Sequence, residues 1–154
     1  MRTGKLNIPT FPKNQMGQVT ATITVANNID KILAERGFIA PEEVRSITLE
    51  NVLVDTGATT LSLPTAIAEK LGLAVKGETV VKTASGTLKS RIFREVHLTI
   101  NGRSSSFEAI ELTNMDVPLL GVLPMEALGL EPDLQNQRPR MLSMDGEDTY
   151  IHVL

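Results

Sequence analysis

The sequence predicts a mainly-β domain made of many short strands with two or three short helices. Apolar and polar residues alternate in stretches such as residues 18–27, which is typical of half-buried strands. Turn residues such as Asn101-Gly102 separate the apolar runs, and helical signals are confined to short stretches. The chain has 154 residues, of which 42% are hydrophobic. This length fits one domain with one packed core.

The first half of the chain divides into an arm, a strand and a helical stretch. Residues 1–17 contain prolines and glycines without a helical period, so we expect an N-terminal arm before a domain over residues 18–154. After the strand at 18–27, Asn27 or Asn28 can cap a helix over 29–36, and Gly37 can end it. Pro41 fits the first turn of another short helix. We interpret residues 27–46, approximately, as a helical insertion.

The second half predicts further strands and hairpins. A strand runs from Ser46 to Asp55, and Pro64 opens a short helix over about 65–71. One hairpin has its tip at Ala84-Ser85-Gly86, and a second turns at Asn101-Gly102. Two closing strands are expected around Asp145-Gly146.

Two stretches of the chain resemble each other. Residues 61–73 and 121–130 both contain a Leu-Pro pair, then a short predicted helix, then Leu-Gly-Leu. A chance match is the alternative for so short a repeat. If the repeat is structural, the domain consists of two similar halves around an approximate two-fold axis.

Composition excludes several classes of function. The net charge is −3 and no basic cluster occurs, so a nucleic-acid partner is not expected. There is no cysteine, which excludes disulfides and thiolate metal sites. His97 and His152 lack a second ligand at metal spacing, and residues 145–148 lack the spacing of a calcium loop. No stretch has the length of a signal peptide or membrane span. We therefore expect a cytoplasmic protein without metal, cofactor or membrane partner.

The strand ending at Asp55 runs into a loop of small residues, in the stretch VLVDTGATTL. Gly57 has no side chain, so its backbone can approach the carboxylate of Asp55 and donate to it. The hydroxyl of Thr56 can fix the turn by bonding to a neighbouring loop. Such a loop positions a carboxylate rigidly. The alternative is a turn aspartate that only caps a helix.

The stretch VLVDTGA resembles the active-site signature of aspartic proteases. One copy in a chain of this length resembles the retropepsin-like branch, which is retroviral-type and single-lobed, and within it the bacterial and cyanobacterial members. Residues 119–124, LLGVLP, are similar to that family's second hallmark. The resemblance covers about residues 46–132. It implies a closed, acid-protease-like β-barrel with a flap hairpin, assembled as a symmetric homodimer.

The resemblance also implies roles for residues. Asp55 would be catalytic, one of two carboxylates that activate a water to cleave a peptide or protein substrate. The active-site loop would comprise Thr56, Gly57 and Ala58, with Thr56 bracing the partner's loop. The flap would comprise Thr83, Ala84, Ser85 and Gly86, and the supporting element Leu119, Leu120 and Gly121.

The second carboxylate is expected from another copy of the chain. The sequence contains one Asp-Thr-Gly, and Asp116, the best rival within the chain, precedes Pro118 and two leucines rather than small residues. A two-fold homodimer would bring Asp55 of each subunit to the axis.

Two other functions stay open. The fold could serve as a catalytically silent dimerisation or peptide-binding module. Phosphoryl transfer through an aspartyl phosphate is the second, but Thr56 follows Asp55 directly, without the lysine found between acid and threonine in such sites.

Overall fold

The predicted mainly-β architecture is confirmed. The computed structural model describes residues 18–113 and 115–142. Four short helical segments accompany the strands: α1 (Asn28–Glu35), the 3₁₀ helix η1 (Pro41–Glu43), α2 (Thr65–Lys70) and α3 (Val122–Ala127). The strands are β1 (Val19–Asn27), β2 (Ser46–Val54), β3 (Leu61–Pro64), β4 (Val75–Thr83), β5 (Gly86–Ile100), β6 (Arg103–Leu112), β7 (Leu119–Leu120), β8 (Leu130–Asp133) and β9 (Arg138–Met141).

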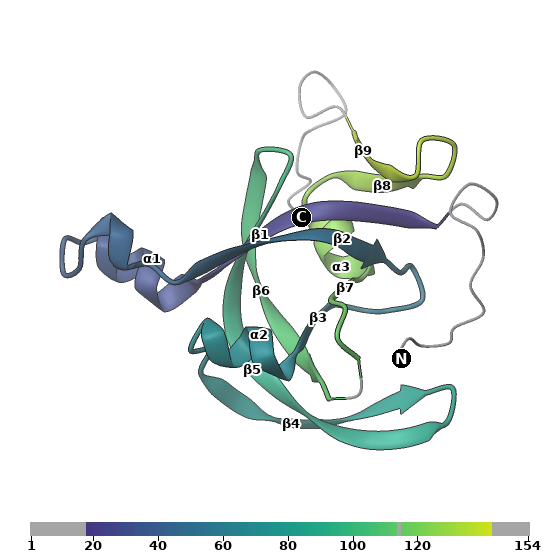
Figure 1. Cartoon of the computed structure of the whole chain (residues 1–154), viewed down its shortest axis with the longest axis horizontal. Helices are drawn as coiled ribbons and strands as arrows, with labels where there is room; N and C mark the ends of the chain where they lie inside the picture. Colours follow the sequence, from purple (N-terminus) through teal and green to yellow (C-terminus); the bar gives the residue numbers. More distant parts are fainter. Residues whose placement is uncertain (1–17, 114, 143–154) are drawn as a thin grey trace, which may run out of the picture.

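Six strands close into a barrel (Figure 1). The order is β1-β2-β7-β3-β6-β5, and β5 pairs again with β1, which completes the ring. Strand β4 lies outside the ring and pairs with β5. Alternation of apolar residues along the strands fills the interior with apolar side chains, because one face of each strand points inward. Fully buried members include Ile23, Val25, Val52, Leu61, Leu63, Phe93, Leu98 and Ile100.

The barrel contains two similar halves, as the internal repeat predicts. Strand β7 runs parallel to β2, and β3 runs parallel to β6. Strands β7 and β3 meet antiparallel at Ser62 and Leu119. Each of these two strands leads into a short helix, α3 after β7 and α2 after β3. The repeated sequence therefore corresponds to a repeated strand-helix unit beside each half of the barrel.

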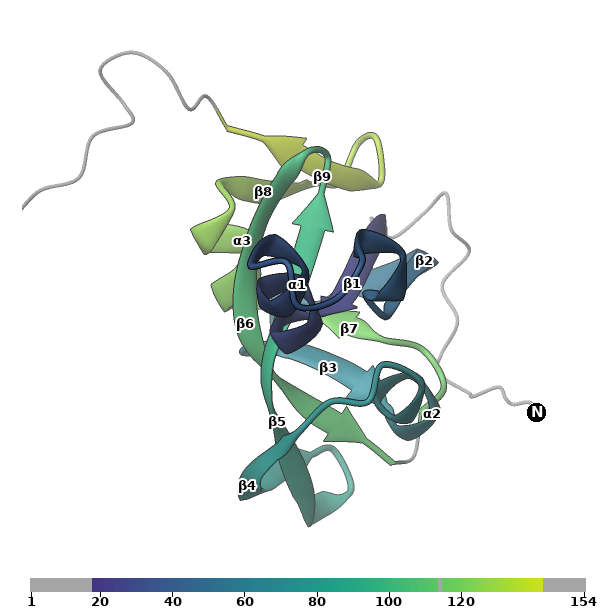
Figure 2. The same cartoon turned by 90° about the vertical axis from the view of Figure 1, so that its left-hand side faces the viewer.

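The two predicted hairpins share one long strand. Strand β5 pairs with β4 up to the turn at Ala84-Ser85, and with β6 up to the turn at Asn101-Gly102. Asn101 and Gly102 have φ of 50° and 82°, the left-handed conformation that a two-residue hairpin turn requires. The register of β5 against β6 shifts between Phe93 and Val96. The β4–β5 part of the hairpin extends beyond the barrel (Figures 1 and 2).

A third hairpin, β8–β9, was not predicted. Its prolines, Pro132 and Pro139, argue against strands in the sequence, because proline cannot donate to a ladder. In the structure they face each other. The N–H of Leu142 donates to Gly129 O over 2.8 Å, so by alternation the 132–139 pair is not a hydrogen-bonded one and loses no ladder bond. The strands expected around Asp145-Gly146, like the arm over residues 1–17, lie outside the described residues.

Helix α1 forms as predicted, but its apolar residues do not pack into the core. The Asn27 side chain caps it by accepting from the Asp30 N–H over 3.0 Å. Ile29 and Ile32 are 49% and 43% exposed, whereas Asp30 is buried. The helix lies at the end of the β1–β2 hairpin and projects from the barrel (Figure 1). Its apolar residues therefore have no second layer of the fold to pack against. None of the helices in the described residues is long and apolar enough to cross a membrane.

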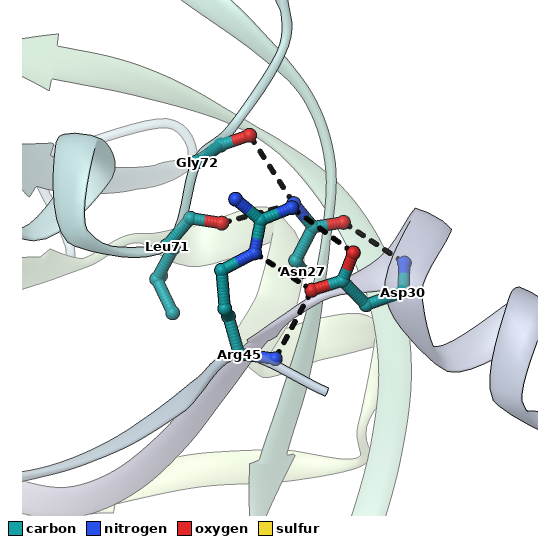
Figure 3. A network of polar contacts seen from close by, with 5 residues as sticks. All are labelled: Asn27, Asp30, Arg45, Leu71 and Gly72. Atoms are coloured by element: carbon teal, nitrogen blue, oxygen red, sulfur yellow. Dashed lines mark hydrogen bonds and ion pairs between the residues drawn. The ribbon is translucent and has the colours of Figure 1, made fainter. Parts of the chain in front are cut away.

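A polar network ties α1 to the barrel (Figure 3). The Arg45 guanidinium donates to Asp30 through Nε (2.8 Å to Oδ2) and Nη2 (3.1 Å to Oδ1). This pairing lowers the pKa of Asp30. The Asn27 amide donates to the carbonyls of Leu71 and Gly72, at the end of α2. The position of α1 thus depends on charge-assisted hydrogen bonds.

Candidate active site

Strand pairing fixes the backbone at Asp55. Leu53 and Val54 of β2 lie beside Leu119 and Leu120 of β7 in parallel register. The pairing continues one residue further, because the Asp55 N–H donates to Leu120 O over 3.0 Å. The aliphatic residues before Asp55 are held in the barrel wall, and the acid emerges half-buried where the strand ends.

The loop after Asp55 turns back on the carboxylate. The Gly57 N–H donates to Asp55 Oδ1 over 2.9 Å, and the Ala58 N–H donates to Asp55 O over 3.0 Å. A Cβ at Gly57 would lie 3.2 Å from Asp55 Oδ1, so a side chain there would crowd this contact. The close approach of backbone to acid expected from the sequence is present. Thr56, at the crest of the loop, is exposed.

Helix α3 supports this loop from behind. Its first N–H groups, from Val122 and Leu123, donate to Ala58 O (3.0 Å) and Thr59 O (2.9 Å). Gly121 makes this approach possible, since a Cβ there would lie 2.5 Å from Thr60 O and 2.7 Å from Ala58 O. The structure therefore brings Leu119, Leu120 and Gly121 together with the Asp55 loop, although more than 60 residues separate them in sequence.

A pocket of about 380 Å³ adjoins the acid. Its walls come from the end of β2, from β7 and α3, from β8, and from Leu142 after β9. The sequence did not predict this pocket, because the β8–β9 hairpin was not predicted. Its lining is mostly apolar, with two glutamates: Val54, Leu120, Val122, Met125, Leu130, Pro132, Leu142, Glu126 and Glu131, beside Asp55, Thr56 and Gly121.

The predicted flap residues form the tip of the β4–β5 hairpin. The Thr83 hydroxyl donates to Gly86 O over 2.9 Å and accepts from the Ser85 N–H over 3.3 Å, while Ala84 completes the turn. Gly86 has a φ of +131°, which disfavours any other residue there. In Figure 1 this tip and the β2–β3 connection that carries Asp55 lie toward the same, right-hand side of the molecule. Within the described residues no hydrogen bond joins the tip to the Asp55 loop.

A partly buried ion pair near the base of this hairpin was missed in the sequence. The Arg91 guanidinium of β5 donates to both carboxylate oxygens of Glu111 on β6, over 2.9 and 2.8 Å. The Thr65 hydroxyl donates to the same carboxylate over 2.7 Å. Chiefly through Arg91, these bonds lower the pKa of Glu111 to about 2. The available signal was weak: an acid in β6 on the same strand face as the buried Ala109.

Other candidates from the sequence do not gather at the site. Asp116 is exposed in the 113–118 connection. His97 is half-buried in β5, where burial lowers its pKa. Among the residues that the structure describes, no group of three or more metal-binding side chains comes together.

Comparison with known proteins agrees with this geometry. The sequence profile described as "Aspartyl protease" matches residues 43–142. No curated protein matches the chain. Among solved structures, the protease of EIAV in complex with the inhibitor HBY-793 is similar, with a TM-score of 0.52 and 20% sequence identity. The alignment covers 78% of this chain and 94% of that chain, and it shows a shared fold. The chain belongs to the aspartyl protease family, with the retropepsin-like single-lobe fold.

Proposed function

We propose that this protein is an aspartic endopeptidase whose site is completed by a second copy of the chain. The observation that supports this best is the doubly braced Asp55 loop. Gly57 approaches the carboxylate from one side, and the first N–H groups of α3 hold the loop from the other. A turn aspartate with no function would not need a glycine at position 121 to admit the loop.

The proposed chemistry requires two carboxylates on one water. One carboxylate acts as general base and removes a proton from the water, which attacks the carbonyl carbon of the peptide bond. The other, protonated, donates to the carbonyl oxygen, and the proton taken from water passes to the leaving amine. Because two close carboxylates do not both ionise, they share one proton and titrate as a pair.

A second copy is the simplest source of the second acid. Within residues 18–113 and 115–142, Asp55 is the aspartate held in an Asp-Thr-Gly loop. A two-fold axis beside Asp55 would place the partner's Asp55 next to it. Thr56 is exposed at this point and available to a partner. The apolar pocket also adjoins Asp55, so the same face of the molecule offers apolar surface that a second copy of the chain could bury. The β4–β5 hairpin would then bond to a peptide through its main chain.

Substitution of Asp55 by Asn tests the proposal. The amide preserves the size of the side chain and can still accept from the Gly57 N–H, so folding should be unchanged. Cleavage of a broad peptide library, assayed from acidic to neutral pH, should be lost. A mixed dimer of one wild-type and one Asp55→Asn chain should also be inactive, because both subunits build one site.

Three outcomes would contradict the proposal. Cleavage that persists in purified Asp55→Asn protein would exclude Asp55 as the catalytic acid. Active mixed dimers would exclude a shared site. A folded wild-type dimer that cleaves no member of the library would instead favour the silent dimerisation or peptide-binding module.

A further inference from the structure

Toward its tip, the β4–β5 hairpin stops pairing with strand β6 of the barrel. Pairing between β5 and β6 reaches Ile92 and Ile110 and goes no further toward the hairpin tip. From there, β4 and β5 pair only with each other as far as Thr83 and Gly86. A lone two-stranded hairpin is marginally stable and its direction is weakly fixed. The contacts at its base therefore decide where its tip lies.

The first side chain beyond this point makes the ion pair with Glu111. We call Arg91, Glu111 and Thr65 the hairpin clamp. Two parallel N–H···O bonds from Arg91 fix both the distance and the plane of the guanidinium relative to β6. The Glu111 carboxylate is 7% exposed, so solvent screens it little. Arg91 also stands over the Phe93 ring, 5.3 Å from its centroid. The clamp thus replaces backbone pairing where that pairing stops.

Glu111 is also connected to the Asp55 loop, through the strands next to β6. Glu111 lies opposite Leu63 of β3, and Thr65, which donates to it, begins α2. Strand β6 ends one residue later and the chain continues through the 113–118 connection to β7. There Leu120 O accepts the Asp55 N–H. Because Ser62 of β3 also pairs with Leu119 of β7, the paired strands β6, β3 and β7 connect the base of the hairpin with the backbone of the acid.

The length of the hairpin amplifies small changes at its base. Gly86 is five positions along the strand from Arg91, or roughly 17 Å away at about 3.4 Å per residue. A change of roughly 10° in the angle of the hairpin would move its tip by roughly 3 Å. That displacement is as long as a hydrogen bond, and it would remove main-chain contacts between tip and peptide.

We propose that Glu111 is a positioning residue, which through Arg91 sets the angle at which the β4–β5 hairpin leaves the barrel and so places the tip over a peptide at Asp55. The proposal rests on the proposed peptidase function. Glu111 itself would touch neither the substrate nor the reacting atoms. Its loss should weaken peptide binding and leave the chemical step nearly unchanged.

The chain contains a matched control in the Asp30–Arg45 pair (Figure 3). This pair is also bidentate, with distances of 2.8 and 3.1 Å, and its carboxylate is 9% exposed. It connects α1 to the start of β2, on the left of Figure 1 and away from the hairpin tip. Neutralising either acid leaves a comparable arginine without its partner. General loss of stability should therefore be similar in the two variants, and only Glu111 should affect the hairpin.

The test compares full-length Glu111→Gln and Asp30→Asn with wild type. A peptide that wild type cleaves, chosen from the library, is the substrate. We expect Glu111→Gln to raise KM about tenfold with kcat within about threefold, and Asp30→Asn to change neither by more than about twofold. Hydrogen exchange in residues 78–90 should rise in Glu111→Gln and stay at the wild-type level in Asp30→Asn.

A double variant, Arg91→Gln with Glu111→Gln, separates positioning from stability. It leaves no unpaired charge at the base of the hairpin, so it should unfold less readily than Glu111→Gln alone. Its KM should nevertheless stay raised, because two neutral amides do not reproduce the bidentate geometry. This variant also keeps the test valid if Glu111→Gln folds poorly.

The outcomes are distinguishable from those for the peptidase function. Equal hydrogen exchange of residues 78–90 in Glu111→Gln and wild type would overturn the clamp, whatever the enzyme does. Raised exchange with unchanged KM, or an equal rise in KM in Asp30→Asn, would overturn the positioning role. Failure of the peptidase function appears elsewhere, as cleavage that survives in Asp55→Asn.

Discussion

Replacing Gly121 by Ala adds one methyl group where the Asp55 loop touches α3. The added Cβ would lie 2.5 Å from Thr60 O and 2.7 Å from both Thr60 N and Ala58 O. All three are backbone atoms, so no side chain can rotate away. Gly121 has a φ of −92°, which alanine adopts without strain. The whole effect of the substitution is therefore steric.

The magnitude follows from how far the loop must move. Ordinary van der Waals contact to a carbon begins at about 3.5 Å, so loop and helix must separate by roughly 0.8–1 Å. Overpacking of this kind costs about 1–3 kcal/mol. The bonds from Val122 and Leu123 to the loop would lengthen beyond hydrogen-bonding range, at about 1 kcal/mol each. We expect the free energy of unfolding to fall by roughly 3–5 kcal/mol.

Urea denaturation of Gly121→Ala measures this loss, and Gly77→Ala is the matched control. Gly77 also lacks a positive φ, but a Cβ there would meet nothing within 4 Å. We expect its free energy of unfolding to change by less than about 1 kcal/mol. If Asp55 is catalytic as proposed, peptidase activity should fall about a hundredfold in Gly121→Ala, because a displacement near 1 Å of the catalytic group is enough. Equal stability of the two variants would refute the steric account.

Two further predictions concern charged groups. The pKa of Glu111 is about 2 in the folded protein and near 4.5 unfolded, so its contribution is complete above about pH 4.5 and is lost as the pH falls toward 2. Urea titrations should show wild type more stable than Glu111→Gln by about 1–3 kcal/mol at pH 6, after allowance for the partly exposed Arg91. This difference in the free energy of unfolding should shrink steadily below pH 4.5. A difference that stays constant with pH would contradict the prediction. Arg103 donates to carbonyls at the open end of the β8–β9 hairpin, at Leu128 and Gly129 before β8 and at Leu142 after β9. Arg103→Ala should lower stability by about 1–3 kcal/mol and increase hydrogen exchange in residues 130–141, unlike Arg138→Ala at an exposed position of β9.

Local signals in the sequence predicted the parts of the fold that depend on neighbouring residues. The Asn101-Gly102 turn and the Asn27 cap are determined by a few consecutive residues, and both form as expected. The β8–β9 hairpin was not predicted, and its prolines give no local signal for strands, because proline fits a strand only at positions that do not bond. Pro132 and Pro139 occupy positions that need no donor, and this depends on register, which a single strand does not reveal.

The site shows the same division between local and long-range information. The close contact between Gly57 and Asp55 spans two residues and was predictable from chemistry. The role of Gly121 was suggested through resemblance, and its physical reason, contact with the backbone of Thr60, appears only in three dimensions. The hairpin clamp joins residues 20 and 46 positions apart, so alternation along a strand could not identify it.

The internal two-fold relation identifies the counterpart of each site residue within the chain. Helices α2 and α3 have six residues each and both lead into Leu-Gly-Leu, so Leu63 corresponds to Leu120. Val54 lies beside Leu120 where β2 meets β7, and Glu111 lies beside Leu63 where β6 meets β3. Both pairs are parallel, and β7 meets β3 antiparallel, so the relation exchanges β2 with β6 and β7 with β3. The residue after Val54 is Asp55, and the residue after Glu111 is Leu112.

The second half of the barrel thus repeats the frame of the site without its acid. Leu112 stands where the counterpart of Asp55 would stand. The counterpart of Gly121 is Pro64, and the next residue, Thr65, donates its hydroxyl to Glu111 over 2.7 Å. That half therefore has a proline in place of the glycine that admits the acid loop. Because its internal counterpart carries no carboxylate, Asp55 can share a water with a second acid in an equivalent setting only if another copy of the chain supplies it.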